Sequence, residues 1–123
     1  MKKTAIILSL LTCFAFASVN AQNNGTNAAM VKVYHKYIIE REIPGAGKLS
    51  QAQLNDIATK SCVTIYQQKN LVQWLESYVT ENKVYCVYLA ENEEAIREHA
   101  RLAGFPVNKI SEVKTMLDPT AAK

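Results

Sequence analysis

Hydrophobic and polar positions along the chain predict four strands and two helices. Residues 31–43 are rich in β-branched and aromatic side chains and run into Pro44-Gly45, which predicts a long strand closed by a turn. Residues 71–80 and 83–90 have a similar character, and the two residues that join them are short enough for a tight hairpin. Residues 107–117 predict the fourth strand.

The two helices are predicted from capping residues and apolar spacing. Ser50 can cap the first helix while Gln53 reaches back to it, and the helix is expected to end near residues 69–70. Asn92 can cap the second helix, and Gly104 provides a left-handed stop. The expected buried faces are Leu54, Ile57, Ala58, Ser61 and Ile65 in the first helix and Ile96, Ala100 and Ala103 in the second.

The order of these elements, βαββαβ, predicts the fold class. Right-handed crossovers turn it into an α+β, ferredoxin-like sandwich, with a four-stranded antiparallel sheet and two helices on one face. The strand over residues 83–90 is apolar on both sides: Val84, Cys86 and Tyr88 oppose Tyr85, Val87 and Leu89. A strand of this kind is expected to be covered on both faces, so we expect a homodimer formed through the open sheet face.

The N-terminal segment has the pattern of an export signal. Lys2 and Lys3 precede an apolar run over residues 4–17, and Val19 and Ala21 supply the small side chains of a cleavage site. The run is short for a transmembrane helix. We therefore expect a periplasmic or secreted protein that has no membrane anchor after cleavage. The expected divisions are a signal peptide over 1–21, a flexible leader over 22–29, the ferredoxin-like domain over 30–118 and a C-terminal tail over 119–123.

Charge and composition narrow the range of partners. The chain has 123 residues, 49% of them hydrophobic, and a formal net charge of +3. Lys2 and Lys3 are two of the 14 basic residues, so the chain after residue 21 carries a net charge of +1. Without a cluster of Lys and Arg that would follow phosphates, no nucleic-acid partner is expected. The length fits one domain with a modest core.

Two cysteines and one helix histidine are the first candidates for chemistry. Cys62 and Cys86 could form a disulfide in an exported protein, pack as small buried hydrophobes, or ligate a metal, and there is no Cys-x-x-Cys motif. His99 lies one position from the expected core residue Ala100, which favours a structural role at the edge of the core over a metal ligand. No Ser-His-Asp order, glycine-rich phosphate loop or nucleophile elbow is present.

Two strand carboxylates complete the set of candidate donors. Glu40 lies in the first strand and Glu76 in the second, and both strands neighbour the one that carries Cys86 in the expected fold. If their faces agree, carboxylate, thiolate and imidazole groups suit nickel, copper or zinc. The alternative is that Glu40 or Glu42 forms an ion pair with Arg41, Arg97 or Arg101.

Several runs resemble, in combination, a bacterial family of small ferredoxin-like domains of unknown function. They are IEREIPGAG (39–47), SC (61–62), VQW (72–74), SYVT (77–80), YCVY (85–88), IREHA (96–100), GFP (104–106) and DPT (118–120). The resemblance implies a dimer and, because an actinobacterial member binds nickel, a protein that binds nickel or another divalent transition metal. The matching residues with ligand chemistry are Glu40, Cys62, Cys86 and His99. Relatives can carry His at the position of Glu76, which makes Glu76 a fifth candidate.

The pattern and the resemblance together favour an exported nickel-binding homodimer over an enzyme. Two alternatives stay open. One is a small-molecule-binding domain or an enzyme that uses a cavity between helices and sheet, with His99 or Glu40 as acid or base. The other is a dimerisation module with no catalytic residue.

Overall fold

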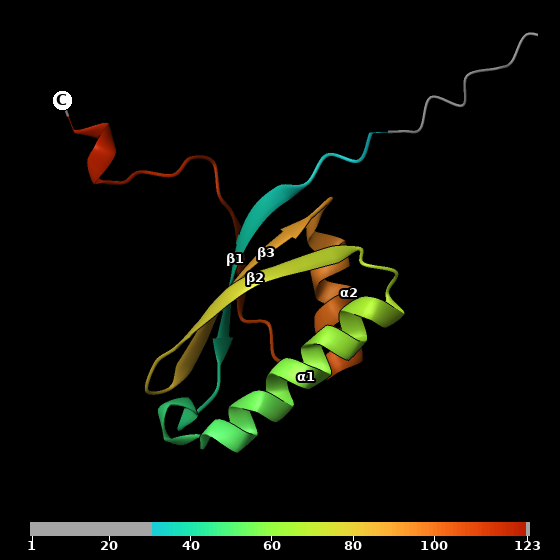
Figure 1. Cartoon of the computed structure of the whole chain (residues 1–123), viewed down its shortest axis with the longest axis vertical. Helices are drawn as coiled ribbons and strands as arrows, with labels where there is room; N and C mark the ends of the chain where they lie inside the picture. The colour runs from blue at the N-terminus through green and yellow to red at the C-terminus, as the bar shows by residue number, and fades with distance from the viewer. Residues whose placement is uncertain (1–30, 123) are drawn as a thin grey trace, which may run out of the picture.

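The computed structural model describes residues 31–122 and confirms the predicted ferredoxin-like topology. The predicted signal peptide and leader lie outside the described residues. The elements are β1 (His35–Glu42), η1 (Ala46–Lys48), α1 (Gln51–Gln67), β2 (Val72–Val79), β3 (Lys83–Ala90), α2 (Glu93–Ala103), β4 (Lys109–Glu112) and η2 (Pro119–Ala121). The strands form one antiparallel sheet in the order β2-β3-β1-β4, and both helices lie on the same side of it (Figure 1).

The predicted capping residues begin and end the helices as expected. Ser50 and Gln53 form both hydrogen bonds of a capping box at the start of α1. The side chain of Asn92 accepts from the backbone N–H of Ala95 at the start of α2. Gly104 ends α2 in the left-handed conformation, with φ of 68°, which a side chain would disfavour. These local signals explain why the boundaries of both helices were predictable.

The strand register divides the sheet into an inner face that meets the helices and an outer face that neither helix covers. Ile39 lies opposite Cys86 and Trp74 opposite Tyr88, all on the inner face. A register shift between Trp74 and Glu76 places Glu76 opposite Val87, on the outer face. After this bulge the alternation of side chains in β2 is therefore inverted.

The core is packed mainly between α2 and the inner face. Its buried members are Tyr37, Ile39, Val72, Cys86, Tyr88, Ala90 and Ile96. Burying these side chains is the main source of stability, at roughly 25 cal/mol per Å² of apolar surface. The sheet and α2 therefore hold the inner-face side chains of β1 and β3 in fixed positions.

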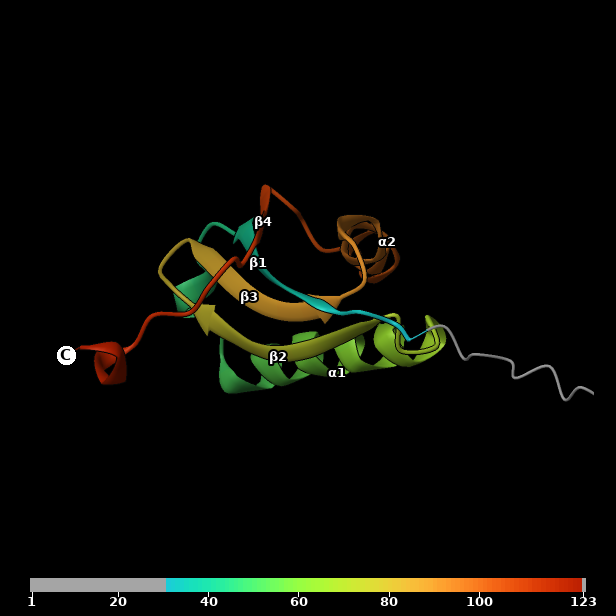
Figure 2. The ribbon, with the colours of Figure 1, turned by 90° about the horizontal axis from the view of Figure 1, so that it is seen from above.

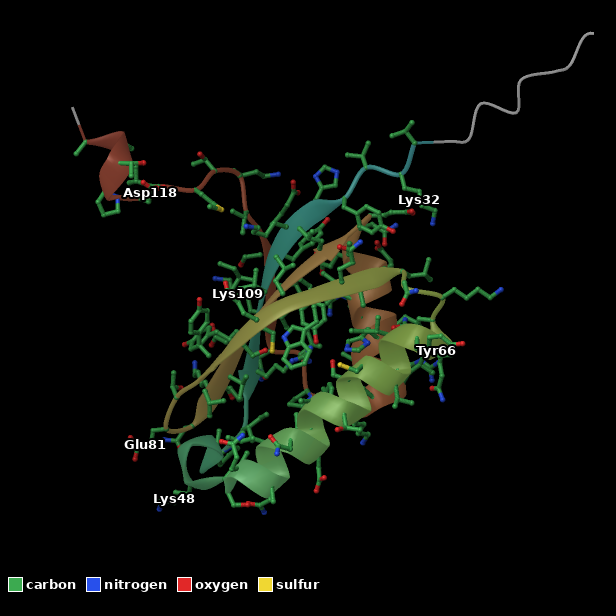
Figure 3. All side chains as sticks on the ribbon, in the orientation of Figure 1. Lys32, Lys48, Tyr66, Glu81, Lys109 and Asp118 are labelled. Carbon is green, nitrogen blue, oxygen red and sulfur yellow. The ribbon has the colours of Figure 1, made fainter. Side chains whose placement is uncertain are left out.

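Helix α1 lies along β2 and is less buried than the apolar spacing predicted (Figure 2). Ser61 and Thr64 are buried, but Leu54, Ala58 and Ile65 are only partly so. The prediction that Ile57 is buried is wrong, since 38% of this residue is exposed. Farther along the helix, Tyr66 points away from the sheet (Figure 3). The reason for the low burial is an unfilled space between α1 and the sheet.

The segment before α1 is held against the β2–β3 turn. The backbone N–H of Gly47 donates to the carbonyl of Glu81 at 3.0 Å. A Cβ at Gly47 would lie 3.1 Å from the Cα of Glu81, so a side chain here would push the turn away by a few tenths of an ångström. Figure 3 shows Lys48 of η1 beside the turn that carries Glu81. The contact fixes where α1 begins relative to the sheet.

The first and last strands of the chain are shorter than predicted. The first strand begins at His35 rather than at residue 31, and the last covers 109–112 rather than 107–117. Strand β4 is antiparallel to β1 and runs toward the N-terminal end of β1. The last hydrogen bond between them is donated by the N–H of Val113 to the carbonyl of Lys36. Beyond Val113 the chain has no strand to pair with, and Met116 and Leu117 are exposed. Within residues 31–122, no helix is long and apolar enough to cross a membrane.

Candidate functional site

His99 of α2 is fully buried and is at the centre of a polar cluster that contacts α1 and β3. Its Nδ1 lies 3.1 Å from Oε1 of Gln68, and its Nε2 lies 3.3 Å from both the Ser61 Oγ and the Tyr88 hydroxyl. An amide oxygen only accepts, so Nδ1 carries the hydrogen. In a neutral ring Nε2 then accepts from the two hydroxyls.

The electrostatics of the cluster agree with this protonation. Burial, followed by the positive charge of Arg41, lowers the pKa of His99 to about 4. Burial also raises the pKa of Tyr88, so this phenol is neutral at pH 7. The hydroxyls of Ser61 and Tyr88 lie 3.2 Å apart, which makes three contacts among two hydroxyls and Nε2. The hydroxyls of Ser61 and Tyr88 have one hydrogen each, so together they can make only two of the three hydrogen bonds at once. Either hydroxyl can therefore turn toward another acceptor while the other still donates to Nε2.

Arg41 of β1 is a buried cation on the same inner face, with 3% of its surface exposed. Its Nη1 donates to the carbonyl oxygen of Pro106 at 2.6 Å, and its guanidinium carbon lies 5.4 Å from the centre of the Phe105 ring. Its Nη2 is shielded from solvent and has no hydrogen-bond partner. Within the described residues no carboxylate forms an ion pair with Arg41. Burying a cation without an anionic partner costs folding free energy, so Arg41 is a candidate for a functional role.

A cavity of about 270 Å³ lies between α1 and the inner face and touches this cluster. Arg41, Ser61 and Tyr88 form the buried polar part of its wall, and Gln51, Asn55 and Ser77 are further polar residues that line it. The rest is mainly apolar and includes Trp74, Leu54 and other side chains of α1, β2 and β3. The cavity accounts for the poor burial of α1, and it joins an apolar space to hydroxyl and guanidinium groups.

The residues proposed as metal donors are separated by the sheet. Cys86 is buried on the inner face, in the cavity wall, whereas Cys62 is exposed on α1. Glu40 is on the outer face, where one of its carboxylate oxygens lies 2.5 Å from Nζ of Lys83. Glu76 is on the outer face and accepts a hydrogen bond from the hydroxyl of Tyr78, which raises the pKa of Tyr78. The faces of Cys86 and the two carboxylates do not agree, so no shared site forms.

These positions do not fit a nickel site within one chain. Among residues 31–122 no group of three or more His, Cys, Asp or Glu side chains could hold a metal ion. Both hydrogen-bonding nitrogens of His99 are already engaged. The closest imidazole–carboxylate contact is a pair, with His35 Nδ1 at 3.2 Å from an oxygen of Glu112.

Two further predictions are settled by the same geometry. Cys62 and Cys86 are both free, so the disulfide alternative is wrong. The expected arginine partner of Glu40 or Glu42 is also wrong, because Lys83 lies between these two carboxylates. Arg97 and Arg101 instead pair with Glu93 and Glu98 on the surface of α2.

Sequence reasoning missed three members of the cluster. Arg41 was considered only as an ion-pair partner, although it alternates with the buried residues Tyr37 and Ile39 and thus shares their face. Ser61 was placed on the buried face of α1, but its contact with His99 depends on how the two helices meet. Gln68 follows α1 directly, and nothing in the local pattern indicates its bond to His99.

The cluster is better suited to binding than to catalysis. A hydroxyl hydrogen-bonded to imidazole resembles the start of a nucleophilic site. A His99 pKa of about 4, however, makes the ring a weak base at neutral pH. What the cavity offers is one cation, redirectable hydroxyls and an apolar wall, which can hold a small molecule.

Comparison with known proteins identifies one matching family model and one similar solved structure. The family model described as "Nickel responsive protein SCO4226-like" matches residues 37–113. Among solved structures, the crystal structure of SCO4226 from Streptomyces coelicolor A3(2) is similar, with a TM-score of 0.57 and 15% sequence identity. The similarity covers 67% of this chain and 99% of that one. The search of curated proteins found no match.

Proposed function

The chain belongs to the SCO4226-like family of nickel responsive proteins, and we propose that it is a small-molecule-binding protein whose ligand occupies the cavity between α1 and the sheet. The observation that carries this proposal is a cavity of about 270 Å³ whose wall combines Trp74 with the buried groups of Arg41, Ser61 and Tyr88. Binding sites for small molecules are mostly apolar and contain a few convergent polar groups.

The size of the cavity limits the ligand. A cavity of about 150 Å³ in another protein accommodates benzene, so 270 Å³ corresponds to a molecule of about ten non-hydrogen atoms. Nothing in the cluster supplies a strong base at neutral pH, so we assign the site to binding rather than turnover. The pattern of residues 1–21 leads us to propose that this binding takes place after export, in the periplasm or outside the cell.

Filling the cavity is expected to abolish ligand binding. Trp74, the only tryptophan of the chain, lines the cavity and reports occupancy through its fluorescence. In a titration with hexanol, hexanamide, hexanoate and hexylamine, we expect at least one to shift the Trp74 emission in a saturable way. Ala58→Phe places a ring in the cavity and is expected to remove the response. Ala52→Phe, on the exposed side of α1, is the matched control and is expected to retain it.

Two outcomes would refute the cavity as a ligand site. One is a wild-type protein whose Trp74 emission responds to none of the four probes. The other is an equal loss of binding in Ala52→Phe and Ala58→Phe, which would trace the effect to α1 in general.

Nickel binding by a homodimer is a second candidate, favoured by the family match. We propose that two copies associate through the outer sheet face, where Ile38, Tyr85, Val87 and Leu89 form an apolar area that neither helix covers. Glu40 and Glu76 lie on this face, and a second copy would add two more carboxylates. A metal site of this kind needs donors from both copies, because one chain does not assemble it.

Nickel titration calorimetry, with the mass in solution measured alongside, tests this second candidate. We expect a dimer that binds one Ni²⁺ per two chains, and a double variant Glu40→Gln with Glu76→Gln that binds at least about tenfold more weakly. Glu98→Gln, a surface change on α2, is the control. A monomeric protein, or one that gives no heat with Ni²⁺, would rule the candidate out.

A further inference from the structure

The unsatisfied charge of Arg41 points to the chemical class of the cavity ligand. Of the side chains that line the cavity, Arg41 alone is charged. Its Nη2 has no hydrogen-bond partner, and 3% of the residue is exposed. A buried guanidinium with a free N–H and no carboxylate partner is best compensated by an anion.

The arrangement around Arg41 favours one negative charge over several. The Pro106 carbonyl already accepts from Nη1, and the ring of Phe105 lies under the guanidinium. These contacts orient the guanidinium group, and its Nη2 is left without a hydrogen-bond partner. One guanidinium balances one carboxylate, whereas a doubly charged phosphate would carry excess negative charge into a mainly apolar cavity.

The hydroxyls of Ser61 and Tyr88 are available to donate a hydrogen bond to the same anion. The positive charge of Arg41 lowers the pKa of His99. The same charge, together with a side-chain contact to the phenol, opposes the rise that burial gives to the pKa of Tyr88, so the three groups share one electrostatic environment. Ser61 and Tyr88 have two hydroxyl hydrogens for three contacts, so one can donate to a carboxylate oxygen while the other still donates to Nε2 of His99.

We propose that the cavity binds a monocarboxylate with a small apolar body. Its carboxylate pairs with Arg41 and accepts from Ser61 or Tyr88, and its apolar body lies against Trp74 and Leu54. This inference rests on the proposed binding function and adds the charge of the ligand to it.

The test compares two probes of equal size that differ in charge, hexanoate and hexanamide, by titration at pH 7.5 with Trp74 emission as the readout. We expect hexanoate to bind at least about tenfold more tightly than hexanamide, since only hexanoate carries a negative charge that compensates the buried guanidinium. Arg41→Met is expected to reduce hexanoate affinity at least about tenfold and to reduce hexanamide affinity by a smaller factor, so that the preference for hexanoate is lost. Arg101→Met, the same change at an exposed position, is expected to alter neither.

The outcomes separate this inference from the function on which it rests. Equal affinities for hexanoate and hexanamide would overturn the monocarboxylate assignment and leave the cavity as a site for neutral ligands. Binding of neither probe, nor of hexanol or hexylamine, would overturn both. The comparison of the two probes in the wild-type protein needs no variant, so it holds even if Arg41→Met does not fold.

Discussion

Replacing His99 with Gln is expected to reduce the loss of stability that the fold undergoes between pH 6.5 and pH 4. The pKa of His99 is lowered to about 4 in the folded protein, from its ordinary value of 6.5. Between these values the unfolded chain binds a proton that the folded chain does not, so acid favours unfolding. The shift corresponds to about 3 kcal/mol, present above pH 6.5 and lost as the pH falls to 4.

The groups that face His99 explain why the ring resists protonation. Ser61 of α1 and Gln68, which directly follows α1, are uncharged. Tyr88 from β3 is a neutral phenol, and Arg41 from β1 is a cation. A proton on Nε2 would remove the acceptor for both hydroxyls and place a second positive charge near the guanidinium. The network therefore couples the protonation of His99 to the shape of the cavity wall.

Urea unfolding of the wild-type protein and His99→Gln at pH 7 and pH 4 measures this effect. We expect the wild-type protein to lose about 3 kcal/mol more than the variant over this interval. His35→Gln is the matched control, since it makes the same change on a partly exposed ring that contacts Glu112. If the wild-type protein and His99→Gln lose the same free energy of unfolding between pH 7 and pH 4, the His99 ring does not stay neutral in the folded protein.

Ile39→Ala is expected to destabilise the fold by about 3 kcal/mol, while Ile38→Ala costs less than about 1 kcal/mol. The two residues are adjacent in β1 but lie on opposite faces. Ile39 is fully buried in the core, and 42% of Ile38 is exposed on the outer face. Truncating Ile39 removes apolar contacts and leaves a space that the close-packed core fills poorly.

Urea unfolding at low protein concentration distinguishes the two faces, and sedimentation of the same samples adds a second readout. If two copies associate through the outer face, Ile38→Ala weakens association more than it weakens the fold of each chain. Equal losses of unfolding free energy in Ile38→Ala and Ile39→Ala would contradict the assignment of the inner face as the core.

The order of elements was predictable because its signals are local. Ser50, Asn92 and Gly104 mark helix ends through contacts within a few residues, and the two-residue turn before Lys83 leaves a hairpin as the simplest connection. The length of the last strand was not predictable in this way. It depends on where β1 stops offering hydrogen bonds, which is a property of the pairing partner.

The candidate site was less predictable because it depends on parity across strands. Trp74 and Glu76 are two residues apart and would share a face in a regular strand, but the bulge between them places them on opposite faces. The register of β1 with β3 likewise sets Glu40 opposite Tyr85 rather than Cys86. A proposed donor set that crosses three strands depends on all of these registers at once, and the structure separates it.

The importance of Arg41 was also not predictable, because its burial and its place in the cavity wall depend on the three-dimensional structure. Arg41 is one of twelve basic residues after the predicted signal, and the only local signal that marks it is its alternation with Tyr37 and Ile39. Its unbonded Nη2 and its place in the wall of a mainly apolar cavity make it the residue from which the ligand class follows. The family description names a nickel response, and the proposed cavity site would be a separate binding capacity within the same fold.

A crystal structure of the protein grown with hexanoate would show whether the cavity holds a monocarboxylate. We expect density for hexanoate between α1 and the sheet, with its carboxylate within hydrogen-bond distance of the Arg41 guanidinium and its alkyl chain against Trp74. A cavity closed by the side chains of α1, or hexanoate bound with its carboxylate away from Arg41, would contradict it.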